Sequence, residues 1–231
     1  MFRFKQFTIR QDHTPMKVGT DGVLLGAWAA CEEAGNILDI GTGTGLIALM
    51  AAQRNPRAQI HALEIDPGAV AQAGDNIAAS PWAERIRLHP LPLQEYAPGC
   101  RFDCIICNPP FFAGSTLPPE TGRSIARHTD SLPHGELVTH AARLLADEGN
   151  LCVILPPAEA VRFAELAATQ GLHPRRVTHV LPNPGKAPKR HLVELTTRRQ
   201  ACSESELIVE YSRHHYSPEY IKLTRNFYLN L

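Results

Sequence analysis

Residues 36–54 of the chain read NILDIGTGTGLIALMAAQR. The first five residues are mostly apolar, as in a buried strand, and the last nine have the composition and length of a helix. Glycines stand at 41, 43 and 45 in the connection, where residues without a Cβ let the backbone pass close to a ligand. This stretch therefore predicts one strand–loop–helix unit of an α/β sheet, with a ligand at the loop.

The alternation of strand and helix patterns continues toward the C-terminus. Strands are predicted at 36–40, 58–65, 85–90, 102–107, 151–156, 174–182 and 190–198, and helices at 46–54, 66–79, 134–149 and 158–170. The linker NPGKAPK between the last two strands is rich in turn-forming residues and predicts a hairpin. We expect a Rossmann-like α/β fold whose seven-stranded, mostly parallel sheet has helices on both faces and a C-terminal β-hairpin.

The length of 231 residues is enough for one packed domain and does not require two. We expect a single domain over 1–231, with an N-terminal extension at 1–35, a core at 36–200 and a C-terminal segment at 201–231. Because the closing residues FYLNL are largely apolar, that last segment is expected to dock on the core. A content of 44% hydrophobic and 20% charged residues is typical of a globular protein.

Charge and cysteine content exclude several classes of protein. The formal net charge is zero, so a polyanionic partner would need local basic clusters. No stretch approaches the roughly 20 apolar residues that span a bilayer, and the N-terminus lacks the pattern of a secretory signal, so we expect a cytoplasmic protein without a membrane partner. The six cysteines are expected to be buried thiols. Cys104 and Cys107 lie on opposite faces of one predicted strand, and we expect no metal site.

Two classes of cofactor compete for the glycine loop. A dinucleotide fingerprint is Gly-x-Gly-x-x-Gly or Ala, but here the third glycine comes one residue early and Leu46 stands where a small residue is needed. This difference disfavours a nucleotide-binding oxidoreductase. Glu64 ends the second strand, where its carboxylate can accept both hydroxyl groups of a ribose.

The spacing DxGxGxG resembles the first motif of class I S-adenosylmethionine-dependent methyltransferases. The resemblance implies S-adenosylmethionine as the cofactor, held at Asp39, Gly41, Gly43 and Gly45, with Glu64 on its ribose. The family usually places an aspartate after the third strand to contact the adenine. Pro92 or Leu93 takes that place here, so adenine recognition falls to backbone groups, at Leu93 for example, or to Gln94.

The predicted strand at 102–107 ends in Asn-Pro-Pro-Phe-Phe, on the sheet edge that carries the glycine loop. This resembles the NPPF motif of methyltransferases that modify planar amines. The Asn108 oxygen and the Pro109 carbonyl can each accept one N–H of such an amine, and the prolines stiffen the loop. Phe111 is expected to stack on the base, and Phe112 is a second candidate. The predicted catalytic residues are Asn108, Pro109, Pro110 and Phe111, and Asn108 is also expected to border the cofactor.

A closer resemblance covers essentially the whole chain. FTIRQDHTPMKVGTDGVLLGAW at 7–28, with DIGTGTG, ALEID, NPPFF, ARH and the closing FYL, is similar to bacterial tRNA(Val) adenine-37 N6-methyltransferases. It implies transfer of a methyl group to N6 of adenine-37 in the anticodon loop, with tRNA as the partner of a monomeric protein. In that family the segment before the first strand borders the cofactor, which implicates Lys17, Val18, Gly19, Thr20 and Asp21.

RNA phosphates need cations nearby. Arg127 lies in a long loop at 114–133, which we expect to cover the target base as a lid. In the hairpin linker, Lys186, Lys189 and Arg190 are the other predicted substrate contacts, and Arg213 near the C-terminus is a further candidate.

Other functions stay open for the same motif. NPPF also serves guanine N2 and glutamine amides, so an rRNA guanine-N2 methyltransferase or a protein glutamine-N5 methyltransferase remains an alternative. Phe111 and the short segment of 35 residues before the first strand disfavour the glutamine enzyme. A non-catalytic RNA-binding module is a third alternative, and it would bind the cofactor without methylating any RNA.

Overall fold

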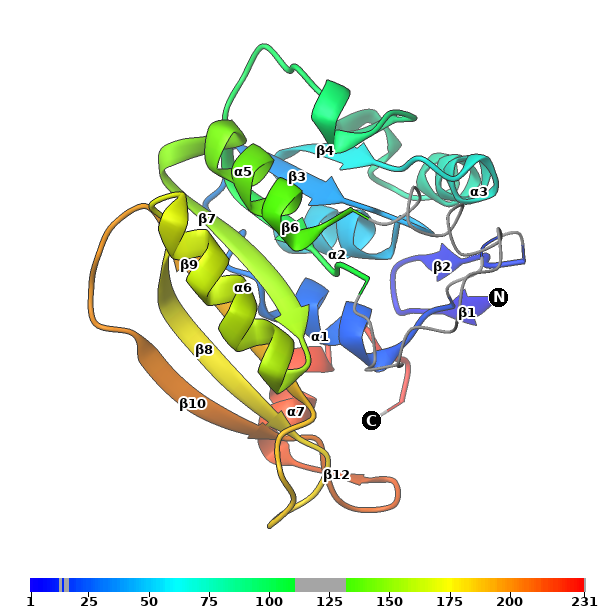
Figure 1. Ribbon diagram of the computed structural model, residues 1–231. Helices are drawn as coiled ribbons and strands as arrows, with labels where there is room; N and C mark the ends of the chain where they lie inside the picture. Colours follow the sequence, from blue (N-terminus) through cyan, green and yellow to red (C-terminus); the bar gives the residue numbers. More distant parts are fainter. Residues whose placement is uncertain (13, 15–16, 111–131, 231) are drawn as a thin grey trace, which may run out of the picture.

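The computed structural model describes residues 1–12, 14, 17–110 and 132–230. Its centre is an eight-stranded sheet in the order β10-β8-β9-β7-β6-β3-β4-β5 (Figure 1). The strands are β3 (Asn36–Ile40), β4 (Gln59–Leu63), β5 (Ile86–His89), β6 (Phe102–Cys107), β7 (Leu145–Leu155), β8 (His173–Leu181), β9 (Arg190–Thr196) and β10 (Ser203–Ile208). All of them run parallel except β9, which is antiparallel to both of its neighbours.

Helices cover both faces of this sheet, and two short hairpins lie outside it. The helices are α1 (Thr20–Trp28), α2 (Leu46–Arg54), α3 (Pro67–Ala78), α5 (His134–Leu144), α6 (Pro157–Thr169) and α7 (Pro218–Thr224), with 3-10 turns η1 (Ala83–Arg85) and η2 (Leu93–Glu95). The hairpins are β1 (Phe2–Arg3) with β2 (Thr8–Ile9), and β11 (Glu210–Ser212) with β12 (His215–Tyr216).

The seven predicted strands are all present, but the sheet has an eighth. β10 adds to the edge by pairing in parallel with β8. Its sequence SESELI has four exposed residues before the first buried one, so it lacks the alternation that marks a half-buried strand. Charged residues on an edge strand discourage pairing with other chains, which accounts for this polar sequence.

The helix predicted at 134–149 was too long. α5 ends at Leu144, and residues 145–149 begin β7 instead. Leu145 pairs with Phe102 of β6, with a register shift before Cys104. A Cβ on Gly149 would lie 2.7 Å from the Phe102 carbonyl oxygen, so the two strands approach closely there. Pairing with β6 satisfies backbone hydrogen-bonding groups in residues 145–149, and this outweighs the helical spacing of their apolar side chains.

The core consists of two layers separated by the sheet. α1, α2 and α3 pack on one face, and α5 and α6 on the other, in front of the sheet in Figure 1. Cys104 belongs to the first layer and Cys107 to the second, as predicted from their spacing. Burial raises the pKa of the Cys107 thiol well above its usual range.

The two ends of the chain pack against each other. Phe4 stacks on Phe7 with ring centroids 4.7 Å apart, and the Lys5 amide donates to the Phe227 carbonyl at 2.8 Å. Phe227 is buried, so this end of the chain contacts the core. Among the helices of the described ranges, none has the length and apolar character to cross a membrane.

Candidate active site

The carboxyl ends of β4, β3 and β6 lie side by side (Figure 1). The side of the sheet that these strand ends form is its carboxyl edge, as distinct from the outermost strands β10 and β5. Ile40, the last residue of β3, is in register with the last residues of both β4 and β6. The residues that follow are Gly41, Glu64 and Asn108, which therefore form a row with about 4.8 Å between neighbouring strands. The structure thus brings together the glycine loop, the acidic residue and the Asn-Pro-Pro motif.

The glycine loop has a backbone that only glycine adopts readily. Gly41, Gly43 and Gly45 have φ of 69°, 59° and 82°. A Cβ added to Gly41 or Gly43 would meet no described atom within 4 Å. The loop therefore leaves open space against its backbone, and glycine is required there by φ rather than by neighbouring protein atoms. A ligand can approach these peptide groups closely.

Asp39 is the buried acid beneath the loop. It is 1% exposed, and its Oδ2 accepts hydrogen bonds from the Thr42 hydroxyl at 2.5 Å and the Ala48 amide at 3.1 Å. Its Oδ1 is buried and finds no hydrogen-bond partner within the part of the chain that the structure describes. Burial raises the pKa of Asp39 to about 7, and the charge of Glu64 adds to this effect. A cationic group bound at the loop would satisfy this acid.

Asp39→Asn should change how stability depends on pH. Because the pKa of Asp39 is raised from 3.8 to about 7 in the folded protein, the stabilisation from its proton is present at low pH. That stabilisation is lost as the pH rises to about 7. Asparagine cannot ionise, so the free energy of unfolding of wild type relative to the variant should fall by about 2–3 kcal/mol from pH 5 to pH 8. Urea unfolding at several pH values measures this, and parallel profiles would contradict it.

Glu64 is half-buried, and backbone N–H groups hold its carboxylate in place. Oε2 accepts the Gly43 amide at 2.8 Å, and Oε1 accepts the amides of Ile65 at 2.8 Å and Asp66 at 3.0 Å. The carboxylate therefore ties the glycine loop to the end of β4. Three of the roughly four lone-pair sites of the carboxylate are occupied, and the remaining one, on Oε2, can accept a ligand hydroxyl.

Asn108 presents an acceptor that lacks a partner. Its Oδ1 is buried and makes no hydrogen bond to any described residue. Pro109 is buried and Pro110 is exposed. A buried amide oxygen without a partner is costly in a folded protein, so a ligand with N–H donors is the expected partner at this position. Phe111, Phe112, Arg127 and most of the predicted lid at 114–133 lie outside the described residues.

His134 is a neighbour of this motif that the sequence did not indicate. It begins α5, and its ring donates a hydrogen bond to the Pro110 carbonyl. Its Nδ1 lies 3.9 Å from Glu159 Oε2, and its ring packs edge-on against Phe163. Burial lowers the pKa of His134, while Glu159 and the Pro110 carbonyl act in the opposite direction. The histidine therefore connects the Asn-Pro-Pro motif to α5 and α6.

The segment at 17–21 lies against the N-terminal residues. The Val18 amide donates to Gln11 Oε1 at 2.7 Å, and the exposed Lys17 donates its Nζ to the Gln11 carbonyl. Gly19 is the N-cap of α1, followed by an exposed Thr20. Asp21, in the first turn of that helix, forms an ion pair with Arg190 at 2.7 Å. The role of this segment at the cofactor stays a prediction.

Two buried amides on α3 hold the N-terminal segment beside the glycine loop. Asn76 accepts the Arg10 amide and donates to the carbonyls of Arg10 and Thr44, each at 2.8 Å. Gln72 accepts the Asp12 amide at 2.9 Å. Both side chains are 2% exposed. These two residues were not predicted, because nothing in the local pattern of a helix tells which segment its polar residues will meet.

Asn76→Ala should destabilise the protein and loosen the N-terminal segment. The change leaves the buried carbonyl of Thr44 and the part-buried backbone groups of Arg10 without their partners, so we expect a loss of about 2–4 kcal/mol in the free energy of unfolding. Urea denaturation measures it. The adjacent exposed Asp75→Ala serves as the control and should cost less than about 0.5 kcal/mol. A loss in Asn76→Ala as small as in this control would contradict the role given to the amide.

Leu93 has its side chain in the core. It is 4% exposed and packs in the layer under α5, so only its backbone can reach a ligand. Gln94, the next residue, is exposed and donates to Glu136. Adenine recognition by backbone groups in this stretch stays a prediction.

The predicted phosphate contacts lie at the same edge of the sheet as Asn108. Because β9 is antiparallel to β7, the start of β9 lies beside the carboxyl end of β7. Lys186 and Lys189 are exposed in the hairpin linker, whereas Arg190 is half-buried and paired with Asp21. These cations therefore lie at the edge that carries Asn108, where their contact with substrate stays a prediction, and Arg190 also supports α1.

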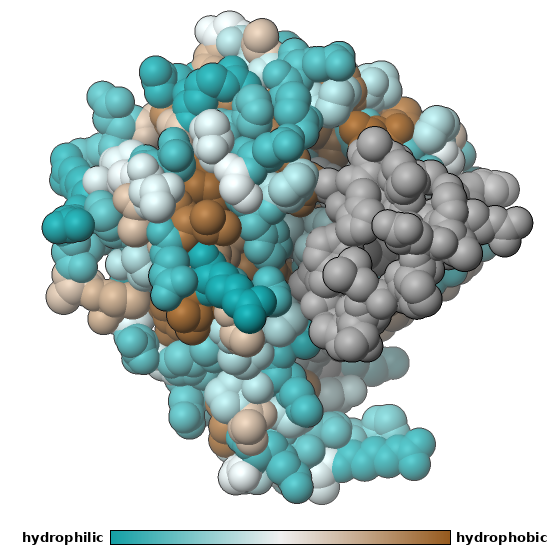
Figure 2. All heavy atoms as spheres, viewed as in Figure 1, coloured by the Kyte–Doolittle hydropathy of each residue, from teal (hydrophilic) through white to brown (hydrophobic). Residues whose placement is uncertain are grey.

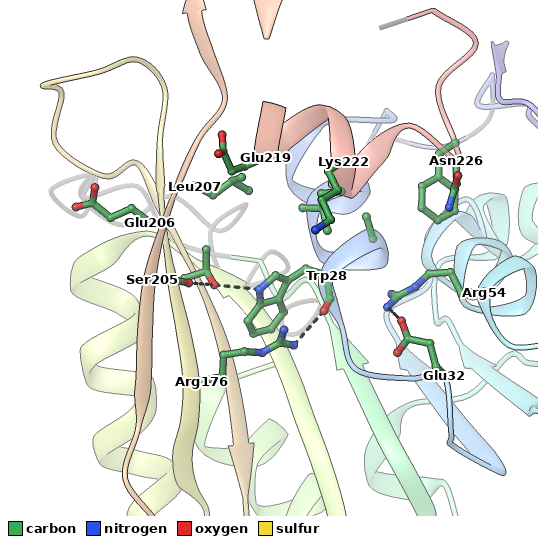
Figure 3. Close-up of a pocket in the computed structure, with 14 residues that line it drawn as sticks. Trp28, Glu32, Arg54, Arg176, Ser205, Glu206, Leu207, Glu219, Lys222 and Asn226 are labelled. Carbon is green, nitrogen blue, oxygen red and sulfur yellow. Dashed lines mark hydrogen bonds and ion pairs between the residues drawn. The ribbon is translucent and has the colours of Figure 1, made fainter. Parts of the chain in front are cut away.

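A cavity of about 480 Å³ lies away from this edge, between α1, α7, β8 and β10 (Figure 3). The Arg176 guanidinium lies 3.7 Å from the centroid of the Trp28 ring and donates to its carbonyl, while the Trp28 indole donates to Thr178. Arg54 pairs with Glu32 across the same cavity. No predicted site residue lines it, and these polar groups satisfy one another.

A mostly parallel sheet with a glycine loop, an acidic residue and Asn-Pro-Pro at neighbouring carboxyl ends defines a Rossmann-like methyltransferase fold. Residues 18–167 match the family described as Methyltransferase small domain. Over its whole length the chain is 47% identical to a tRNA1(Val) (adenine(37)-N6)-methyltransferase of Bacteroides fragilis, covering 98% of it. It is 46% identical to the enzyme of that name from Flavobacterium psychrophilum, with full coverage of both chains. The chain therefore belongs to the methyltransferase small-domain family and, within it, to the family of these tRNA adenine-N6 methyltransferases.

A solved structure has a similar fold. A predicted O-methyltransferase from Agrobacterium tumefaciens superposes with a TM-score of 0.68, covering 90% of this chain and 96% of the other. The two sequences are 21% identical, so this likeness concerns the fold alone.

Proposed function

We propose that this enzyme transfers a methyl group from S-adenosylmethionine to N6 of adenine-37 in the anticodon loop of tRNA(Val). The observation that carries the proposal is the identity of 46–47% to enzymes of that name over the whole chain. The row formed by Gly41, Glu64 and Asn108 supports it with a suitable geometry. We further propose that the chain acts as a single domain, as a monomer in the cytoplasm and without a metal.

The glycine loop and Glu64 fit S-adenosylmethionine. The open space against Gly41 and Gly43 suits the amino-acid part of the cofactor, and the Glu64 carboxylate suits a ribose hydroxyl. The unpartnered oxygen of Asp39 favours a cationic ligand at the loop. Bound there, the cofactor supplies a methyl group on a positively charged sulfur.

Asn108 and Pro109 are proposed to orient the target amine. The lone pair of an amine on a purine is delocalised into the ring, so the nitrogen is a weak nucleophile. The Asn108 oxygen and the Pro109 carbonyl each accept one N–H, which draws the nitrogen toward tetrahedral geometry and turns its lone pair to the methyl group. His134 holds the neighbouring Pro110 carbonyl and so keeps this turn in place. Alignment of the two reactants supplies most of the acceleration.

The experiment that tests the proposal supplies several substrates at once. Total tRNA, total rRNA and a protein extract, all from cells lacking the gene, are incubated with the enzyme and methyl-labelled S-adenosylmethionine, and the labelled nucleosides and amino acids are identified. We expect label as N6-methyladenosine in a valine tRNA at position 37. Asn108→Ala protein in parallel shows that the label depends on this site.

Each alternative predicts a different product in the same experiment. Label in an rRNA guanine or in a protein glutamine would preserve the fold and the chemistry of amine methylation but overturn the substrate. Cofactor binding without label in any fraction would favour the non-catalytic RNA-binding module.

A further inference from the structure

Two hairpins project from the edge of the sheet that carries Asn108. The first is the linker at 182–189 between β8 and β9, and the second is β11–β12, which follows the carboxyl end of β10. The carboxyl ends of β8 and β10, from which the two hairpins start, lie on this edge because both strands run parallel to β7. They form the lower end of the molecule in Figure 1, and Figure 2 shows mainly hydrophilic residues at that end.

Hydrogen bonds hold the two hairpins together as one surface. The Glu210 amide donates to the Pro182 carbonyl at 3.2 Å, and Asn183 Nδ2 donates to the Glu210 carbonyl at 3.1 Å. Tyr216 stacks on the buried Tyr220 of α7 with ring centroids 5.2 Å apart. The surface is therefore ordered before any partner binds, and a partner does not have to supply the free energy to order it.

This surface is basic on a chain with no net charge. Lys186 and Lys189 are exposed on the first hairpin, and Arg213, His214 and His215 on the second. In the described ranges of the chain, none of these five side chains forms an ion pair with a carboxylate. Tyr211 is 45% exposed beside them, with its ring 5.9 Å from that of His215. The three exposed cations, Lys186, Lys189 and Arg213, outnumber the one carboxylate of the two hairpins, that of Glu210, and cations next to an exposed aromatic ring are suited to nucleic acid.

We infer that these two hairpins form a second contact surface for RNA, which binds the phosphate backbone of the anticodon stem. The inference rests on the proposed tRNA substrate. In the sheet order, β9, β8 and β10 lie two to four strands from β6, which corresponds to about 10–19 Å from Asn108. One nucleic acid strand advances about 3.4 Å per stacked nucleotide, so the surface lies about three to six nucleotides from the target base. That separation extends beyond the loop around position 37 and into the stem.

The test uses charge reversal at one residue of each hairpin. Lys186→Glu with Arg213→Glu should raise the Kd for tRNA(Val) about tenfold or more and lower the slope of log Kd against log salt by about 1.5, as expected for two lost phosphate contacts. The kcat at saturating tRNA and the affinity for S-adenosylmethionine should not change. The isolated anticodon stem–loop should show the same loss of affinity, whereas a single-stranded oligonucleotide of the loop alone should not.

The matched control reverses two arginines at the opposite edge of the sheet. Arg57 precedes β4 and Arg198 follows β9, each in an exposed ion pair, and Arg57→Glu with Arg198→Glu changes the net charge equally. This control should bind tRNA as wild type does. Lys186→Ala with Arg213→Ala should show a smaller loss in the same direction, which guards against misfolding of the reversed variant.

Two results would overturn the inference while leaving the proposed function intact. One is wild-type tRNA affinity and salt dependence in both hairpin variants, and the other is an equal loss on the loop oligonucleotide. If the wild-type enzyme methylates no tRNA in the same assay, the proposed function and the inference fall together.

Discussion

Asn108→Ala should lower the rate of methyl transfer to tRNA about 10³-fold while leaving the affinity for S-adenosylmethionine within a few-fold of wild type. The Asn108 oxygen is buried without a partner in the described structure, so its role is expected toward a ligand rather than toward the fold. Loss of one of two acceptors for the target amine should lower kcat about 10³-fold, comparable to removal of one preorganised group from an oxyanion hole. Single-turnover transfer to tRNA and calorimetric titration with the cofactor measure the two effects separately.

Asn36→Ala is the matched control for this variant. It makes the same substitution at the amino end of the neighbouring strand β3, on the opposite edge of the sheet. Its rate should stay close to that of wild type. Near-normal turnover in Asn108→Ala would refute the proposed orientation of the amine, and an equal loss in both variants would point to a general defect of folding.

Glu64→Ala should act on the cofactor instead. The carboxylate accepts the amides of Gly43, Ile65 and Asp66, and we propose that its remaining site, on Oε2, accepts a ribose hydroxyl. A hydrogen bond to a charged group contributes about 1.5–3 kcal/mol, so the Kd for S-adenosylmethionine should rise about 10- to 100-fold. Calorimetric titration gives the Kd directly, and at saturating cofactor much of the kcat should return.

Glu84→Ala provides a comparison for the loss of one negative charge. Glu84 is exposed in η1, ahead of β5 and far from the carboxyl edge of the sheet. Its variant should bind the cofactor as wild type does. A Kd in Glu64→Ala no larger than in this control would exclude the ribose contact, although the hydrogen bond to Gly43 would remain a structural observation.

The elements around the glycine loop were predictable because their signals are local. The strand at 36–40, the helix at 46–54 and the strand at 102–107 were predicted with the bounds that the structure shows. In a parallel sheet, strand ends fall on one edge, so Glu64 and Asn108 were expected near the loop as soon as their strands were identified.

Other parts depend on contacts that a linear pattern does not contain. β10 has a polar sequence because it is an edge, and residues 145–149 are a strand because β6 lies beside them. The roles of Asn76, Gln72 and His134 come from segments that lie 24–66 residues away in the chain. For such buried polar residues, the sequence shows a donor and an acceptor but not the partner.

The register of β3 with its two neighbours has a consequence for how this family tolerates changes in chain length. Gly41, Glu64 and Asn108 each stand one position beyond the last paired residues, so hydrogen-bond pairing of the backbone also aligns the reacting groups. A residue inserted into or deleted from β6 would turn Asn108 to the opposite face, even if the sheet formed again. An insertion near Gly99, in the exposed turn before β6, should leave this alignment intact. Gaps among functional homologues should therefore collect in such turns and be absent from the three strands.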